Sequence, residues 1–165
     1  MVPTLDGHRP ILVEVQALCA TVSYVPPRRS AQGIDSGRLA LLLAVLETRV
    51  TVSTADKEVY ALTAGGVRLV EPAGDLGLAL AVVSAANDVP LPEDAVAVGE
   101  VGLGGEVRPV GRIEHRLTEA ARLGFRRAIV PRGTPPVPGL RLIEVGTVLE
   151  AVAASGLLID VPRAA

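Results

Sequence analysis

The sequence predicts a single α+β domain in which helices and strands form α/β layers. A length of 165 residues suits one domain with one substantial core. Apolar residues make up 49% of the chain, yet its only aromatic residues are Tyr24, Tyr60 and Phe125. The core must therefore consist of interdigitating Val, Leu, Ala and Ile side chains. Strand-like and helix-like segments alternate along the chain without a regular repeat, which is typical of a layered fold.

The first third of the chain predicts a strand region followed by a helix. Residues 11–25 are rich in β-branched side chains and partly alternate in polarity, which predicts a strand or a strand pair. Residues 26–35 contain two prolines, which exclude a central strand there. Asp35 or Ser36 is expected to cap a helix over residues 36–49. Because that segment is apolar on nearly every side, it is expected to lie in the core.

The middle of the chain predicts two hairpins with a buried helix between them. Residues 58–70 read as a strand, a Gly-Gly turn and a second strand. Residues 71–88 predict a second buried helix, with Pro72 suited to its first turn. Residues 96–110 alternate around the Gly-Gly pair at 104–105, which favours a tight type I′ hairpin because both central residues of that turn need positive φ.

The last third predicts a helix, two strands and a final helix. Residues 112–124 place Ile113, Leu117, Ala120 and Ala121 on one helical face, and Gly124 is suited to end the helix. The remaining predicted elements are short strands over 126–131 and 140–145 and a helix over 145–156. We expect one domain over residues 1–160 and a flexible tail over 161–165.

Hydropathy and charge exclude several classes of protein. The longest apolar runs, residues 39–46 and 76–86, fall well short of the roughly 20 residues that a membrane span requires. No charged leader precedes a signal-like segment. We therefore expect a cytoplasmic protein without a membrane partner. The formal net charge of −2 argues against nucleic-acid binding through global charge, so any DNA contact needs a local arginine cluster.

Candidate ligands for metals and nucleotides are sparse. Cys19 is the only cysteine, so the chain can form neither an internal disulfide nor a cysteine zinc cluster, and we expect Cys19 to be a small buried side chain. His8 and His115 are far apart and lack a supporting carboxylate at metal-ligand spacing. The glycines of residues 99–105 do not match a phosphate-binding loop and fit a hairpin turn instead. We predict no metal and no cofactor in this chain.

Four long blocks, residues 9–19, 27–47, 58–76 and 99–131, resemble the C-terminal Lon-like domain of the bacterial RadA (Sms) family of DNA-repair ATPases. Residues 70–94 and 98–131 also resemble the proteolytic domain of Lon-type Ser-Lys peptidases. Together the blocks cover nearly the whole chain. The resemblance implies a Lon proteolytic domain-like fold, which is similar to the ribosomal protein S5 domain 2-like fold.

The same resemblance implies that the peptidase dyad is absent. The nucleophile turn of the peptidases, G-P-S-A-G, aligns with EPAGD at 71–75, which puts Ala73 in place of the serine. Their lysine lies in a G-G-L-K-like run that aligns with GRIE at 111–114, which puts Glu114 in place of the base. A hydroxyl nucleophile needs a nearby base, and neither group is present. We therefore predict a domain that is not an enzyme. The alternative is a peptidase or hydrolase with a site rebuilt around Ser84, Thr118 or Glu114.

Members of the RadA family carry a zinc-binding N-terminus and a RecA-like ATPase ahead of this domain. The resemblance therefore implies ATP, magnesium and zinc for upstream domains, and it suggests that this chain corresponds to an excised C-terminal domain. It also implies a homo-hexameric ring, contact with single-stranded or branched DNA, and a recombinase partner such as RecA during branch migration. The expected function is that of a hexamerisation scaffold and DNA-contacting module.

Two groups of arginines are candidates for the DNA contact. Arg28 and Arg29 lie on a proline-stiffened segment, where two guanidinium groups can hold phosphates at little entropic cost. They can equally be solvated or bridge two subunits. Arg108, Arg112 and Arg116 form a second basic group that runs from the hairpin into the following helix. The alternative for Arg112 and Arg116 is pairing with Glu114 or Glu119 in the same chain.

Overall fold

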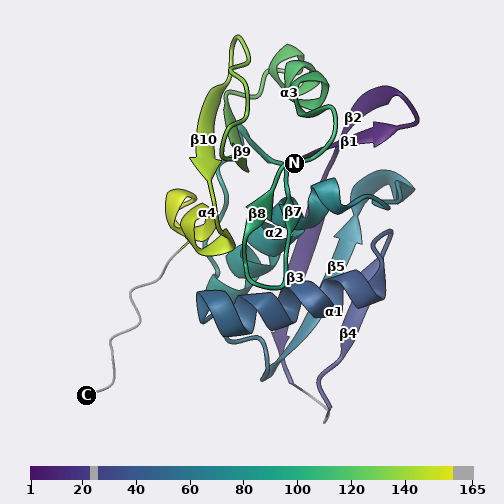
Figure 1. The fold of residues 1–165 in the computed structure, drawn as a ribbon. Helices are drawn as coiled ribbons and strands as arrows, with labels where there is room; N and C mark the ends of the chain where they lie inside the picture. The colour runs from purple at the N-terminus through teal and green to yellow at the C-terminus, as the bar shows by residue number, and fades with distance from the viewer. Residues whose placement is uncertain (23–25, 158–165) are drawn as a thin grey trace.

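A central buried helix lies between two three-stranded sheets in the structure, a computed structural model that describes residues 1–22 and 26–157 (Figure 1). This helix, α2, spans Asp75–Asn87, and every residue from Asp75 to Val83 is buried. Its lack of a polar face follows from its position, because a helix that is covered all round has no side to expose to water.

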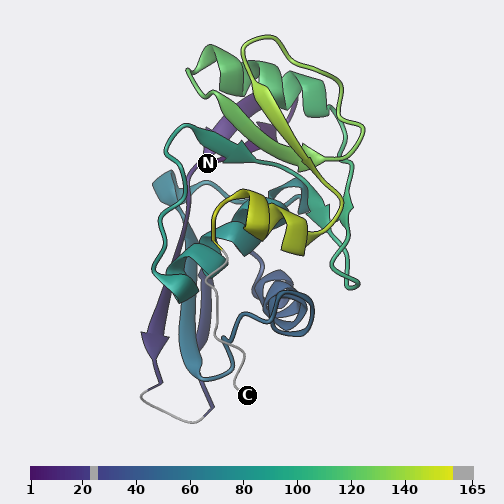
Figure 2. The same ribbon diagram turned by 90° about the vertical axis from the view of Figure 1, so that its left-hand side faces the viewer.

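The first sheet contains β3 (Val15–Thr21), β4 (Arg29–Gln32) and β5 (Lys57–Thr63) in the order β3-β5-β4. β3 runs antiparallel to β5, and β4 runs parallel to it. α1 (Ser36–Val45) and α2 lie on the same side of this sheet, and none of the helices in residues 1–22 and 26–157 covers its other side (Figure 2). Val59 and Ala61 of β5 point into the core beneath the two helices.

The second sheet is parallel and contains β6 (Ala95–Ala97), β9 (Arg127–Pro131) and β10 (Arg141–Val145) in the order β10-β9-β6. Alternate residues of β9 pack in two different hydrophobic clusters. Ala128 and Val130 pack with Leu117 of α3 (Ile113–Arg122), whereas Ile129 belongs to the cluster of α2 and α4 (Val148–Ala154). The period of two along a strand produces this division.

Two antiparallel hairpins complete the fold. One joins β1 (Val2–Asp6) to β2 (Arg9–Val13), and the other joins β7 (Glu100–Val101) to β8 (Val107–Arg108). β1 lies beside the start of α2 and beside α3, and β7 lies beside α2. The hairpins therefore bring the beginning and the middle of the chain to the N-terminal end of the central helix (Figure 1).

The predicted α+β class is confirmed, and so are the helices predicted over 36–49, 71–88, 112–124 and 145–156. The Asp35 side chain caps α1 by accepting a hydrogen bond from the Arg38 amide, and the chain continues past α1 as a π-helical turn over Leu46–Val50. Gly124 ends the α3 region with a φ of 95°. The finer Lon-like fold stays a prediction, and the predicted tail at 161–165 lies outside the described residues.

The strand predictions missed two strands and placed one wrongly. β1 and β4 were not anticipated, and β4 lies within residues 26–35, from which the prolines excluded only a central strand. The prolines precede β4, and it is an edge strand, a position in which a neighbouring proline is tolerated. Residues 67–70 do not return as a hairpin after the Gly-Gly turn. Instead Leu69 forms an isolated parallel bridge with Ile34, next to β4.

The hairpin predicted over 96–110 exists, but its turn is not type I′. Only Gly105 has positive φ, at 86°, and its amide donates to the Gly102 carbonyl, so Leu103 and Gly104 are the central residues. Cys19 is half-buried, and its Sγ lies 3.9 Å from the Val82 carbonyl. None of the helices in the described part of the chain combines the length and the hydropathy needed to cross a membrane.

Candidate functional site

Residues 71–75, which align with the peptidase nucleophile turn, form the entrance to the central helix. Pro72–Gly74 is a single 3-10 turn that leads into α2. Ala73 is only 2% exposed and packs in the cluster of α3 and the second sheet. A Cβ on Gly74 would lie 2.2 Å from a methyl carbon of Leu69, so the Leu69 side chain fills the space beside this turn. The position of the missing nucleophile is thus closed by packing.

Glu71, at the start of this segment, forms an ion pair with Arg116 of α3. Arg116 Nη2 donates to Glu71 Oε2 at 2.6 Å, and Nη1 contacts the other carboxylate oxygen. The Arg116 side chain is 3% exposed, and its remaining donors reach the carbonyls of Gly111 and Pro3. The Thr4 hydroxyl and the Leu5 amide also donate to Glu71. The pair therefore joins β1, α3 and the entrance to α2.

The environment of Glu71 favours its ionised form. Burial by itself would raise the pKa of the carboxyl group, but hydrogen bonds from Arg116, Thr4 and the Leu5 amide outweigh it and hold the pKa below its usual value. The carboxylate is three-quarters buried, so the charge is tolerated only because these donors surround it.

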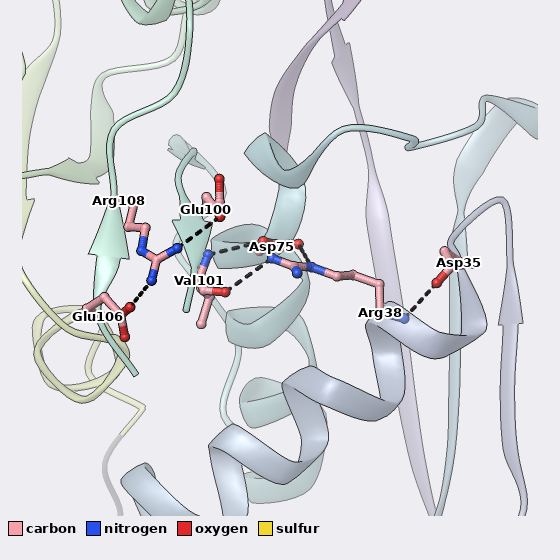
Figure 3. Close-up of polar contacts among 7 residues, drawn as sticks. All are labelled: Asp35, Arg38, Asp75, Glu100, Val101, Glu106 and Arg108. Carbon is pink, nitrogen blue, oxygen red and sulfur yellow. Dashed lines mark hydrogen bonds and ion pairs between the residues drawn. The ribbon is translucent and has the colours of Figure 1, made fainter. Parts of the chain in front are cut away.

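Asp75, at the other end of the segment, forms a second ion pair with Arg38 of α1. Arg38 Nε donates to Asp75 Oδ1 at 2.7 Å, and Nη2 contacts Oδ2. The Val101 amide donates to Asp75 Oδ2, and Arg38 Nη2 donates to the Val101 carbonyl, each at 3.1 Å. Figure 3 shows these groups facing one another between α1, α2 and β7.

The pKa values of Asp75 and Arg38 are both raised, but for different reasons. Burial raises the pKa of Asp75, and the hydrogen bonds from Arg38 and Val101 only partly offset the increase. The hydrogen bond to Asp75 raises the pKa of Arg38. Arg38 and Asp75 line a hollow of about 210 Å³ together with Glu71, Leu69 and Ile34. Its charged groups have hydrogen-bond partners among the described residues.

Glu114, which aligns with the peptidase lysine, lies away from this segment on the surface of α3. It is exposed and lines a different hollow, of about 660 Å³, together with Arg112, His115, Thr118 and Arg132. The Thr118 hydroxyl donates to the backbone carbonyl of Glu114 at 2.8 Å. Among the described residues, no hydrogen bond joins this hydroxyl to a side-chain base.

Ser84, the third residue of the alternative hydrolase site, is separate from both hollows. It lies in α2, where its hydroxyl donates to the Val89 carbonyl at 2.6 Å. It lines a third hollow, beside β3. The structure therefore brings Glu114 and Thr118 together but does not bring Ser84 to them. In the part of the chain that the structure describes, no three His, Cys, Asp or Glu residues cluster as a metal site would require.

The two adjacent arginines of the first DNA candidate group have different environments. Arg28 is exposed. Arg29 is half-buried in β4, where its guanidinium donates to the Thr54 carbonyl at 2.7 Å and to the Lys57 carbonyl. Arg29 thus fastens the loop before β5. Lys57 is the first residue of β5, and its ammonium group donates to the Ala86 carbonyl at the end of α2.

The second candidate group is also divided. Arg108 is 54% exposed and pairs with Glu106 and Glu100 on its own hairpin (Figure 3). Arg112 is exposed, and its Nη1 lies 2.8 Å from His8 Nδ1. Arg116 was expected on the helix surface, but it is buried and pairs with Glu71 rather than with Glu114 or Glu119. This arrangement argues against a phosphate contact by Arg116.

Arg112 also has an unusual backbone conformation. It precedes α3 with φ 55° and ψ 36°, in the left-handed region. Only glycine adopts this conformation without a steric penalty, which is about 1 kcal/mol for other residues. The peptidase run G-G-L-K has a glycine at the aligned position, so the backbone geometry fits that pattern although the side chain does not.

The carboxylates of the two ion pairs were not anticipated from the sequence. Glu71 and Asp75 flank an otherwise apolar segment, and charged residues that lead into a buried helix require partners. That requirement is a signal that the sequence contains. It does not identify the partners, however, because Arg116 and Arg38 lie 45 and 37 positions away.

Comparison with known proteins identifies the family. Residues 42–134 match the family model described as subunit ChlI of Mg-chelatase. The chain is 46% identical to the DNA repair protein RadA of Synechocystis sp. over 150 residues, which are 90% of this chain and 30% of that protein. It is 47% identical to RadA of Mycolicibacterium smegmatis, over 90% and 32% of the two chains, and 46% identical to RadA of Bacillus subtilis, over 92% and 34%.

The family model matches more than half of the chain, and the alignments with the relatives cover about nine-tenths of it. The chain belongs to the ChlI family, and the relatives described above are DNA repair proteins named RadA. The predicted membership in the RadA family is thereby confirmed. The chain spans about a third of the length of the curated relatives it matches.

The opposite pKa directions of Glu71 and Asp75 predict opposite effects of pH on stability. Because the pKa of Glu71 in the folded chain lies below its unfolded value of about 4.3, Glu71 stabilises the fold above that pH, and this contribution disappears as the pH falls through the lowered pKa. Glu71→Gln should therefore lower the free energy of unfolding at pH 7, and the deficit should shrink on acidification. Urea unfolding between about pH 3 and pH 7 measures this deficit.

Asp75→Asn provides the matched comparison. Because the pKa of Asp75 is raised, its contribution is present below the unfolded value and is lost as the pH rises through the folded value. The advantage of the unmodified chain over Asp75→Asn should therefore decrease with rising pH. Parallel pH profiles for the two variants would contradict the assignment.

Proposed function

We propose that this chain is a non-catalytic domain of a RadA-type DNA repair protein, which acts as a hexamerisation scaffold and a DNA-contacting module. The parent would be a RecA-like ATPase that processes recombination intermediates by branch migration, with a recombinase such as RecA as partner. ATP, magnesium and zinc would belong to its other domains. The membership in the RadA family supports a DNA repair role, and the proposal extends that role to this domain.

The observation that carries the non-catalytic part is the closed state of segment 71–75. A methyl group replaces the nucleophile, Leu69 fills the space beside it, and an arginine–carboxylate pair fixes each end. Hydrolysis needs an attackable hydroxyl and a base within hydrogen-bond reach of each other. The charged groups here hold three elements together instead. We infer that segment 71–75, which aligns with the nucleophile turn of the peptidases, has a structural role and connects neighbouring elements of the fold.

The DNA-contacting part rests on the arginines that do not hold the fold together. Arg28, Arg108 and Arg112 are exposed, whereas Arg29 and Arg116 are engaged inside the chain. Arg108 already pairs with two carboxylates, so it offers less to a phosphate than the other two. We therefore propose Arg28 and Arg112 as the principal phosphate contacts. In the proposed ring, repetition of a weak contact on each subunit would raise the avidity for one DNA molecule.

Arg112→Gly tests the DNA contact at a residue whose left-handed backbone suits glycine. The substitution removes the guanidinium, with its contact to His8, and relieves the backbone strain, and urea unfolding of the variant shows whether the fold keeps its stability. We expect Arg28→Ala and Arg112→Gly each to weaken the retention of labelled DNA. Each should reduce the slope of log affinity against log salt by about 0.9 for a lost duplex contact or about 0.7 for a single-stranded one.

Arg122→Ala is the control, because Arg122 is the last residue of α3, which Arg112 precedes, and its side chain is 67% exposed and pairs with Glu119. It should bind DNA like the unmodified chain. If the unmodified chain shows no salt-sensitive retention even at concentrations at which it oligomerises, the DNA contact belongs to another part of the parent protein.

The alternative function, a hydrolase with a rebuilt site, is supported only by the shared hollow of Glu114, Thr118 and His115. We expect no turnover of fluorescent casein, because the Thr118 hydroxyl is directed to a backbone carbonyl. Turnover that disappears in Glu114→Ala or Ser84→Ala would overturn the scaffold proposal. Residual turnover that is the same in both variants would instead identify a contaminating protease.

A further inference from the structure

The outer edge of β3 is an unprotected strand edge. Within residues 1–22 and 26–157, β3 pairs only with β5, and it is the last strand on its side of the sheet (Figure 2). Its sequence, VQALCAT, contains no charged residue and no proline, which are two of the usual protections of an edge. Leu18, at the middle of the strand, is 61% exposed. Such an edge is suited to pairing with another strand.

The backbone groups that point away from β5 can be assigned from the register. The Ala64 amide donates to the Glu14 carbonyl, and Glu14 is in phase with Gln16, Leu18 and Ala20. In an antiparallel pair, alternate residues exchange hydrogen bonds with the same neighbour. The free N–H and C=O groups on the outer edge therefore belong to the other set, which is Val15, Ala17, Cys19 and Thr21.

We propose that β3 pairs with β3 of a second copy of this chain, antiparallel and about a two-fold axis at Leu18. This register places Val15 opposite Thr21 and Ala17 opposite Cys19 of the second copy, so every paired residue has its backbone groups directed outward. Leu18 then faces Leu18 of the second copy in a non-hydrogen-bonded pair, the arrangement in which cross-strand side chains approach most closely. The contact would cover the exposed leucine.

A further feature favours a second copy as the occupant. A hollow of about 650 Å³ lies beside Val15 and Ala17, on the face of the sheet that α2 covers, and is lined by Ala81, Ala85, Val89 and Leu91. It has room for small side chains. In the proposed register, Cys19 and Thr21 of the second copy would lie opposite Ala17 and Val15 and therefore next to this hollow.

This contact differs from the ring in the proposed function. A two-fold contact uses the same patch on both copies and closes at two, whereas a ring requires two different patches on each copy. A seven-residue strand pair buries a small area, so we expect a weak, concentration-dependent dimer. The two proposals can therefore fail independently.

Disulfide formation tests both the contact and its register. In a Cys19→Ser background, Leu18→Cys places two thiols on directly opposite residues about 4.5 Å apart at Cα, within the range that a disulfide spans. Gln16→Cys, on the same face of the same strand, would face Ala20 of the second copy, and Leu123→Cys is an exposed control on another surface. We expect about tenfold more oxidised dimer from Leu18→Cys than from either control. Equal yields would overturn the proposal.

Light scattering over a concentration series gives a second readout without a covalent link. Leu18→Glu should lower the average mass relative to the unmodified chain, while Leu103→Glu, at a residue 67% exposed on the β7–β8 hairpin, should not. An average mass that is unaffected by Leu18→Glu would contradict the contact. Retention of DNA by Leu18→Glu would leave the proposed function intact, because the leucine is not one of its contacts.

Discussion

The arrangement of this domain depends on the ion pair between Glu71 and Arg116. Arg116 is almost fully buried, and its donors are shared between the Glu71 carboxylate and two backbone carbonyls. A buried charge is tolerated only with well-placed partners, so each contact constrains the others. The pair fixes α3 and β1 at the start of the central helix. The Asp75–Arg38 pair similarly fixes α1 and β7 one helical turn further on.

These two pairs give segment 71–75 surroundings that differ from those a hydroxyl nucleophile needs. In a hydrolase the turn must present a hydroxyl to solvent and substrate. Here it presents a buried methyl group and is held at both ends by guanidinium groups. The same position at the entrance to a buried helix can thus support catalysis or assembly, depending on a few side chains.

Much of the fold was predictable, because the helices have strong and uninterrupted apolar patterns. α2 and α3 are examples, and Asp35 was identifiable as a cap from local sequence. The errors occurred where distant contacts decide the structure. β4 forms because β5 supplies a partner, and Leu69 bridges to Ile34 instead of folding back on β5. Arg116 appeared to be a surface residue because its partner lies 45 positions away. Local patterns contain no information about such pairings.

A double-mutant cycle on Arg116 and Glu71 tests the central claim most directly. Arg116→Met, Glu71→Gln and the double variant would be compared with the unmodified chain by urea unfolding at pH 7. The account predicts a loss of about 3 kcal/mol or more for Arg116→Met, since it leaves a largely buried carboxylate without its partner. The double variant should be more stable than the sum of the single losses implies, by about 1.5 kcal/mol or more. Losses that add within about 0.5 kcal/mol would show that the two residues are independent and would contradict the account.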